Sequence, residues 1–368
     1  MTFQKEVKYF LITLSILVLV GIVMVYSASY IYAKESFGSS SYFFIRQLIY
    51  CLLGLGLGFI LSLSKFSFWY KHALIIHYFF ILLLLLTFIP GVGVLLKGSH
   101  RWIGFKGIML QPGELIKYSF ILPALNYFQN FNTFNTRKKI LFSLVFFIPL
   151  TLLLLQPDFG TFSISLAILL FVCFFSSFPR KYFYSFLVLG LSSLVIFMFL
   201  APYRMHRFLT FLDPWKDPRK SGFQIIQSFL AFANGSFLGK GIGNSNEKLF
   251  YLPEAYNDFI FSVIAEELGF VGVALVILLF LSFIYFGFRL ALLAKNITGT
   301  IFITTVIFVI GLQAFFNMGV VLSLLPTKGL NLPFISYGGS SVLANFMAIG
   351  LVFSALRDPK QKEIVHEK

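Results

Sequence analysis

The sequence predicts an all-α membrane protein that crosses the bilayer about ten times. Of its 368 residues, 58% are hydrophobic and only 12% are charged, and the mean hydropathy is +0.88. The apolar residues come in long blocks and lack the three-to-four spacing of a helix on the surface of a soluble protein. Both observations are typical of a polytopic membrane protein, and we expect residues 1–368 to form one membrane domain.

Apolar runs of about 20 residues, the length that crosses a bilayer as a helix, mark the expected spans. The first run resembles a signal peptide that ends in the small residues Ser27, Ala28 and Ser29, but it is too long for one, so we expect an uncleaved first span. In chain order the spans are expected at residues 9–31, 44–64, 73–96, 113–128, 139–155, 160–178, 182–202, 258–288, 299–325 and 336–356.

The distribution of Lys and Arg predicts that both termini lie in the cytoplasm. Every segment on the inner side, including the tail 357–368, then carries at least two basic residues, as the positive-inside rule requires. Residues 203–257 become one long outer loop, and long translocated loops are largely exempt from that rule. Because all inner loops are short, we expect the functional surface on the outer face of the cytoplasmic membrane.

The net charge of +15 does not indicate a nucleic-acid partner. The basic residues lie mostly in short loops between apolar runs, where they act as orientation signals. The two cysteines, Cys51 and Cys173, lie inside apolar runs, where packing explains them better than a disulfide or a metal site.

Basic residues also gather on the predicted outer side, against the overall trend. Two interpretations stay open: they bind an anionic partner, such as a lipid headgroup or a phosphorylated substrate, or they belong to a solvated loop anchored by Trp and Tyr residues. The glycine-rich stretch "GKGIGNSN" within the loop is expected to be flexible. The outer cations considered are Arg101, which stands beside Trp102, and Arg204, Arg207, Lys216, Arg219, Lys220, Lys240 and Lys248.

Glu114 and Lys117 are charged residues inside the fourth expected span. They lie three residues apart, on one face of a helix that Pro112 helps to start. A charge at the bilayer centre costs at least about 2.5–3.5 kcal/mol on insertion scales, so both should face an internal cavity. There they form either an ion pair that fixes packing or a contact to substrate.

Three carboxylates mark the eighth expected span. Asp258 stands where the outer loop meets the span, next to water and to the basic loop, so it is either a general base or, like Asn257, a cap of the helix. Glu266 and Glu267 lie about 12–14 Å deeper at 1.5 Å per residue. Since they cannot act on the same reacting atom, we expect them to be structural and to pair with residues of the bundle.

Residues 324–341, "LLPTKGLNLPFISYGGSS", interrupt an apolar stretch with two prolines and three glycines. Non-helical backbone at membrane depth is tolerated only when it is buried in protein or lines a water-filled cavity. We therefore expect a re-entrant or cavity-lining turn opposite the long loop, with Ser336 as a candidate substrate contact.

Five blocks of sequence together resemble the SEDS family, the bacterial FtsW, RodA and SpoVE proteins. The blocks "RWIGFKGIMLQPGELIK", "LLLQPDFGT", "RFLTFLDPWKDPRKSGFQIIQS", "KLFYLPEAYNDFIFSVIAEELG" and "NMGVVLSLLPTKGLNLPFISYGGSS" follow the family's order between about residue 100 and residue 341. The last block and "FLDPWKDP" look most like the FtsW division branch, with RodA-type elongation and SpoVE-type sporulation as alternatives. Gly113 stands where the family usually has Ser, and Tyr256-Asn257 where it usually has His-Thr.

The resemblance implies a peptidoglycan glycosyltransferase that joins lipid II units at the division septum. It implies that Asp258 takes the proton from the 4-hydroxyl of the acceptor's N-acetylglucosamine as undecaprenyl pyrophosphate leaves. An inversion of this kind needs one base and charge stabilisation for the leaving group. The candidate contacts to lipid II and its pyrophosphate are Arg101, Trp102, Arg207, Lys216, Lys240, Glu114, Lys117 and Ser336.

The resemblance also implies partners. These are a class B penicillin-binding protein, which cross-links the glycan, other divisome membrane proteins and membrane lipid. The one cofactor considered is a divalent cation, Mg²⁺ or Mn²⁺. The competing functions are a transporter for the same lipid, which polar groups in a cavity between helices would also suit, and a non-enzymatic division scaffold, which would leave the outer carboxylate and cations without a task.

Overall fold

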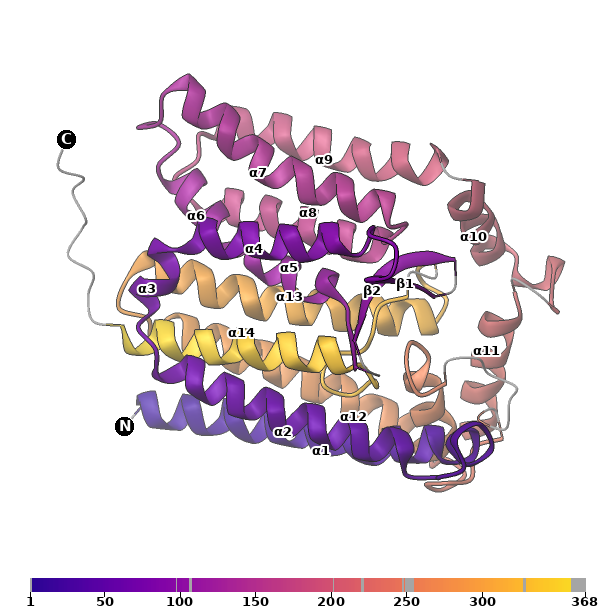
Figure 1. The fold of residues 1–368 in the computed structure, drawn as a ribbon. Coiled ribbons are helices and arrows are strands. Elements are labelled where there is room, and N and C mark those ends of the chain that lie inside the picture. Colours follow the sequence, from indigo (N-terminus) through magenta and orange to yellow (C-terminus); the bar gives the residue numbers. More distant parts are fainter. Residues whose placement is uncertain are drawn as a thin grey trace.

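The computed structural model describes residues 2–96, 98–105, 108–200, 202–219, 222–246, 248, 255–326 and 329–358. Within them the chain is a bundle of helices that run side by side, with one small sheet near one end (Figure 1). The helices are α1 (Thr2–Phe37), α2 (Tyr42–Leu63), α3 (Phe66–Lys71), α4 (Ala73–Leu86), α5 (Pro112–Ser119), α6 (Ile121–Gln129), α7 (Thr136–Leu155), α8 (Phe159–Phe175), α9 (Arg180–Leu200), α10 (Pro202–Leu212), the 3₁₀ helix η1 (Pro214–Lys216), α11 (Phe223–Gly235), α12 (Ile260–Ala291), α13 (Ile297–Val321) and α14 (Gly339–Arg357).

The prediction of an all-α polytopic membrane fold is confirmed. Among the described residues, seven helices are long and apolar enough to cross a membrane: α1, α2, α7, α9, α12, α13 and α14. Helices α4 and α8 are apolar but shorter, and the pair α5 and α6 takes the place of the fourth expected span. The ten expected spans correspond to these seven helices, the two shorter ones and the α5–α6 pair.

The second half of the third expected span, residues 73–96, is not helical. Helix α4 ends at Leu86, and the following residues form the strand β1 (Gly93–Leu96), which pairs with β2 (Ser99–Phe105), which in turn pairs with β3 (Ile108–Leu110). Pro90 lacks the amide that would continue the helix, and Gly91 has a positive φ of 86°. Hydropathy alone assigned this run to a span because the strand residues are as apolar as the helix before them.

Both ends of the described chain lie at the same end of the bundle, as the orientation prediction requires. The start of α1 and the end of α14 are at the left of Figure 1, and the sheet, α10 and α11 are at the right. The expected outer loop 203–257 therefore contains helices, which turn away from the direction of the spans and lie across the end of the bundle.

Helix α12 is broken inside the expected span 258–288. Gly269 has φ 63° and ψ −162°, and the break leaves two carbonyls and two amides without partners in the helix. The segment that follows α11 satisfies all four, which is what allows a break at membrane depth. The four bonds run from Lys240 N to Glu266 O (3.0 Å), from Gly241 N to Glu267 O (2.9 Å), from Phe270 N to Ser236 O (3.0 Å) and from Val271 N to Phe237 O (3.2 Å).

Helices α13 and α14 occupy the interior of the bundle. In an 18-residue stretch of each, 67% and 72% of the residues are buried, against 11% in α9. A side chain on α13 is thus surrounded by protein and not by lipid, so polar groups there can be paired internally. The loop between α13 and α14 contains residues 329–338, which the structure describes as irregular backbone, as expected for this Pro- and Gly-rich segment.

Candidate functional site

Asp258 lies two residues before the start of α12, at the junction between outer loop and helix. Its side chain is partly exposed, whereas Phe259 and Ile260, which follow it, are buried. Phe259 is the N-cap residue of α12 and has no side-chain cap, so Asp258 stands one residue outside the capping position. The placement suits a carboxylate that faces a site at the end of the bundle.

The backbone below the Asp258 side chain is held by three hydrogen bonds, one to each carbonyl of residues 256–258. All three donors belong to α13 or to the loop that follows it. They are Asn317 Nδ2, 2.8 Å from Asp258 O; Ser336 Oγ, 2.7 Å from Asn257 O; and Tyr337 N, 3.0 Å from Tyr256 O. The carboxylate is therefore carried by a fixed backbone, which is the arrangement that keeps a reacting group in one place.

The carboxylate of Asp258 lies against Gly329. A Cβ atom at Gly329 would be 3.4 Å from Asp258 Oδ2, and Gly329 has a positive φ of 63°. Pro326, three residues earlier, lines a pocket. At 3.8 Å for each step along the chain, the Cα atoms of Pro326 and Gly329 are at most about 11 Å apart. The carboxylate of Asp258 thus lies against a residue whose Cα is within about 11 Å of the Cα of a residue that lines the pocket.

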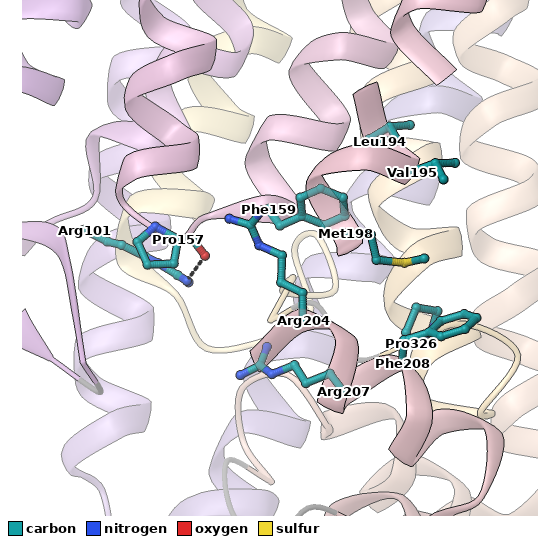
Figure 2. A pocket seen from close by; sticks show the side chains of 10 residues that line it. All are labelled: Arg101, Pro157, Phe159, Leu194, Val195, Met198, Arg204, Arg207, Phe208 and Pro326. Atoms are coloured by element: carbon teal, nitrogen blue, oxygen red, sulfur yellow. Dashed lines mark hydrogen bonds between the residues drawn. The ribbon is translucent and has the colours of Figure 1, made fainter. Parts of the chain in front are cut away.

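The pocket has a volume of about 190 Å³ and combines arginines with an apolar wall. Arg101 comes from β2, and Arg204 and Arg207 come from α10. Figure 2 shows the three arginines below and to the left of apolar side chains contributed by α8, α9 and α10. The other lining residues are Pro157, Phe159, Leu194, Val195, Met198, Phe208 and Pro326, so none of the lining residues is acidic.

Neutral groups fix two of these arginines. Arg101 donates from Nε to Gln156 O (3.1 Å) and from Nη2 to Pro157 O, the bond drawn in Figure 2. Arg204 donates from Nη1 to Phe197 O (2.7 Å), and its guanidinium lies 5.1 Å from the centre of the Phe159 ring. These backbone carbonyls and this ring orient the two guanidinium groups and carry no net charge themselves. The pocket can therefore attract an anion that carries an apolar tail.

Six of the eight predicted substrate contacts do not line this pocket, and three of these six lie on the outer side of the molecule. Trp102 lies on β2 opposite Val94, and Lys216 is exposed on η1. Lys240 forms an ion pair with Glu266, with 2.7 Å between Nζ and Oε1. Conversely, Arg204 lines the pocket although only Arg207 was selected from that helix. Arg204 could have been predicted as well, because the i, i+3 spacing of Arg204 and Arg207 places both side chains on one face of a helix.

Glu114 and Lys117 form a buried ion pair, which is one of the two interpretations that the sequence left open. Lys117 Nζ donates to Glu114 Oε2 and to Gln313 Oε1 (2.6 Å), and Gln313 Nε2 donates to Asn331 O (3.0 Å). Their side chains are only 7% and 1% exposed, respectively. The pair thus links α5 to α13 and to the loop behind Asp258. A direct contact of either residue with substrate stays a prediction.

Ser336 is buried and its hydroxyl has two internal partners. It accepts a hydrogen bond from Leu332 N (2.8 Å) and donates one to Asn257 O (2.7 Å). This placement gives Ser336 a role in supporting the backbone next to Asp258. Its predicted contact with substrate stays a prediction.

Glu266 and Glu267 are fully buried, directly before the break in α12. Most of their partners come from the outer segment after α11, and not from neighbouring helices as expected. The reason is the break in α12, because the outer segment binds the backbone groups that the break leaves free and so lies next to the two glutamates. Glu266 accepts hydrogen bonds from Lys240 Nζ, Ser245 Oγ and Asn246 N, and Glu267 accepts from Lys248 Nζ (2.7 Å) and from Ser27 Oγ of α1.

Glu266→Gln is expected to lower the yield of folded protein more than it lowers turnover. A glutamine keeps one acceptor oxygen but replaces the other with an amide that cannot accept, and each charge-assisted hydrogen bond lost costs about 1.5–3 kcal/mol. The thermal midpoint in detergent and the rate per folded molecule measure the two effects separately. A variant that folds normally yet has no turnover would show that Glu266 takes part in the chemistry.

The described residues contain no group of three or more His, Cys, Asp or Glu side chains placed to hold a metal ion. Mg²⁺ commonly binds through one or two carboxylates together with the phosphates of a substrate. Asp258 is a partly exposed carboxylate at the same end of the bundle as the arginine pocket. The predicted divalent cation, Mg²⁺ or Mn²⁺, fits this chain only as an ion shared between substrate and such a carboxylate, and it stays a prediction.

Comparison with known proteins identifies similar chains over nearly the whole length. A family model described as "Cell cycle protein", covering FtsW, RodA and SpoVE, matches residues 7–361. The probable peptidoglycan glycosyltransferase FtsW of Geobacter metallireducens is 40% identical over 342 residues, which cover 91% of this chain and 90% of that protein. Stage V sporulation protein E of Bacillus subtilis is 37% identical over 348 residues, which cover 93% and 94% of the two chains.

Solved structures share the fold. One, described as "Structural coordination of polymerization and crosslinking by a peptidoglycan synthase complex", has a TM-score of 0.74 and 30% identity, and the match covers 95% of this chain and 96% of that chain. The rod shape determining protein RodA of Thermus thermophilus has a TM-score of 0.70 and 26% identity, with 96% and 97% of the two chains covered.

Proposed function

Because this chain belongs to the SEDS family of FtsW, RodA and SpoVE proteins, we propose that it is a peptidoglycan glycosyltransferase that polymerises lipid II for septal cell-wall synthesis. The match to relatives named peptidoglycan glycosyltransferase FtsW supports the enzyme class and the division branch. The observation that carries the assignment to a site is the position of Asp258, a partly exposed carboxylate on a fixed backbone, at the same end of the bundle as a pocket with three arginines.

Asp258 acts as the general base of a single displacement. It accepts the proton of the acceptor's 4-hydroxyl while that oxygen forms a bond to the anomeric carbon of the donor. The bond from this carbon to the pyrophosphate oxygen breaks, and the electron pair leaves with undecaprenyl pyrophosphate. One base suffices because direct displacement inverts the anomeric carbon without a covalent enzyme intermediate, so no second carboxylate is needed as nucleophile.

The arginine pocket binds the pyrophosphate of the donor. Arg101, Arg204 and Arg207 supply positive charge where negative charge develops on the leaving group. The apolar residues that α8 and α9 contribute to the lining suit the first isoprene units of the lipid tail, which has to continue into the bilayer. Held groups such as Arg101 need little reorganisation when the charge develops, which favours the transition state over the ground state.

The chain works with partners in the bacterial cytoplasmic membrane. The likeness to a chain from a peptidoglycan synthase complex supports a class B penicillin-binding protein as the partner that cross-links the glycan. Other divisome membrane proteins are further partners, and the septum is the site of action. The active face is the extracytoplasmic one, where the end of the bundle carries Asp258 and the arginine pocket.

Reconstitution tests this function. The purified chain, with its penicillin-binding partner, is placed in liposomes that contain lipid II, and both glycan polymer and movement of lipid II between leaflets are recorded. We expect polymer that a muramidase digests. Vectorial movement of lipid II without polymer would assign the chain to transport, and the absence of both in a well-folded complex would favour a scaffold.

Arg207→Ala is expected to raise the KM for lipid II about 10- to 100-fold, since one charge-assisted hydrogen bond contributes about 1.5–3 kcal/mol. Lys216→Ala is the matched control. It removes the same charge from an exposed residue of the same outer region, but Lys216 does not line the pocket, and we expect a change of less than about twofold. Equal effects of the two substitutions would show that the pyrophosphate does not bind in this pocket.

A further inference from the structure

Asn317 lies near the outer end of α13, and only 1% of its surface is exposed. Its amide nitrogen donates two hydrogen bonds, one to Asp258 O at 2.8 Å and one to Leu330 O at 2.7 Å. The two acceptors belong to segments that are more than seventy residues apart in the chain. We infer that Asn317 is a positioning residue, which fixes the location of Asp258 in the site; this inference rests on the proposed role of Asp258 as base.

The amide of Asn317 fixes both the base and the surface against which the base rests. Leu330 is the neighbour of Gly329, and Gly329 lies against the carboxylate of Asp258. A side-chain amide carries two N–H bonds at a fixed angle in one plane, so it sets the direction as well as the distance of both carbonyls. Neither segment can shift relative to the other without loss of one of these bonds.

Packing alone does not account for an asparagine at this position. The carbonyl oxygen of the same side chain, Asn317 Oδ1, is buried and has no hydrogen-bond partner among the described residues. A buried acceptor without a partner is destabilising, and such groups are uncommon in folded proteins. An apolar residue would avoid this cost. The chain keeps the asparagine, and what it gains from it is the pair of N–H bonds to the loop that carries Asp258.

Polar support around the base is not confined to this one side chain. Ser336 bridges Leu332 N and Asn257 O in a similar way, and Gln47 of α2 donates to Ser336 O at 3.2 Å. Asn317 differs from these two residues because it binds the carbonyl of Asp258 itself. Its removal is expected to act on the reacting carboxylate directly, whereas loss of the others acts through neighbouring residues.

A displacement of about 1 Å at a reacting group can cost about 10²-fold in rate. We therefore expect Asn317→Ala and Asn317→Asp to lower kcat about 10- to 100-fold and to leave the KM for lipid II within about twofold, because the arginine pocket is untouched. The Asp variant keeps the volume of the side chain but has no N–H to donate. A similar loss in both variants excludes an empty cavity as the cause.

Asn296→Ala is the control for destabilisation of α13. Asn296 caps the other end of this helix by accepting from Gly299 N, and its amide nitrogen is also buried without a partner in the described structure. Asn296→Ala should lower the thermal midpoint but leave kcat per folded molecule unchanged. If the Asn317 variants keep kcat within about twofold, or if they raise KM and not kcat, the positioning role is wrong.

The same assay separates this inference from the proposed function. Asp258→Asn measured beside the Asn317 variants reports on the base alone. An inactive Asp258→Asn protein together with active Asn317 variants would overturn the positioning role and leave the function intact. An active Asp258→Asn protein would overturn the base, whatever the Asn317 variants do.

Discussion

Asp258→Asn is expected to lower the rate of lipid II polymerisation by about 10²–10⁴-fold, the range that a positioned general base contributes. Asparagine has nearly the same shape as aspartate but cannot take up the proton of the attacking hydroxyl. The side chain is partly exposed, and the substitution keeps the hydrogen bonds that the backbone carbonyls of residues 256–258 accept. Folding and substrate binding should therefore be retained.

Rates of polymer formation per folded molecule measure this effect, with binding of lipid II recorded in the same preparation. Asp213→Asn is the matched control, because it removes one carboxylate from an exposed position of the same outer region. We expect its activity to stay within about twofold of the parent, in line with the small energetic effect of exposed charges. Full polymerisation by Asp258→Asn would mean that another group accepts the proton.

Gly239→Ala is expected to abolish correct folding of the outer half of α12. A Cβ at this position would lie 2.2 Å from Glu267 O and 2.5 Å from the Glu267 carbonyl carbon, which are backbone atoms that cannot move aside. The clash would push the segment after α11 off the break at Gly269, and the hydrogen bonds that this segment makes there would be lost. Glu266 and Glu267 would then lose their lysine partners, and breaking a buried ion pair costs about 3–5 kcal/mol.

Gly243→Ala is the control for this prediction. Gly243 lies in the same segment and has φ 88°, close to the 80° of Gly239, but a Cβ there would meet nothing within 4 Å. We expect it to cost only the left-handed backbone penalty of about 1–2 kcal/mol. The yield of monodisperse protein and its thermal midpoint distinguish the two variants. Similar behaviour of both would show that backbone strain, and not docking onto the break, decides stability.

The spans could be predicted from sequence because hydropathy depends on composition alone. The interruptions were harder to predict. The strand at Gly93–Leu96 is as apolar as helix α4 and was counted with it. The break at Gly269 follows two glutamates, and a glycine after the last turn is a known helix stop. What makes the break stable, however, is a segment about thirty residues earlier in the chain, and no local pattern shows that these two parts meet.

A residue of the site could be predicted where its own position in the sequence indicates its role. Asp258 stands at the boundary of a span and inside a family block, so it could be selected from sequence. The arginine pocket could not, because β2, α10 and the loop with Pro326 contribute to it from distant parts of the chain. Lys240 is predicted to contact substrate because it is one of the cations on the outer side that could bind an anion. Its partner, Glu266, is brought to it only by the fold.

The configuration of the glycosidic bond made by the purified chain tests the central claim most directly. In the proposed mechanism one base, Asp258, drives a single displacement at the anomeric carbon of an α-linked donor. Polymer made from lipid II by the folded chain and its partner, analysed by NMR of the isolated glycan, should contain only β linkages between the joined units. Polymer with α linkages or a mixture of both would contradict the single-base displacement and with it the role assigned to Asp258.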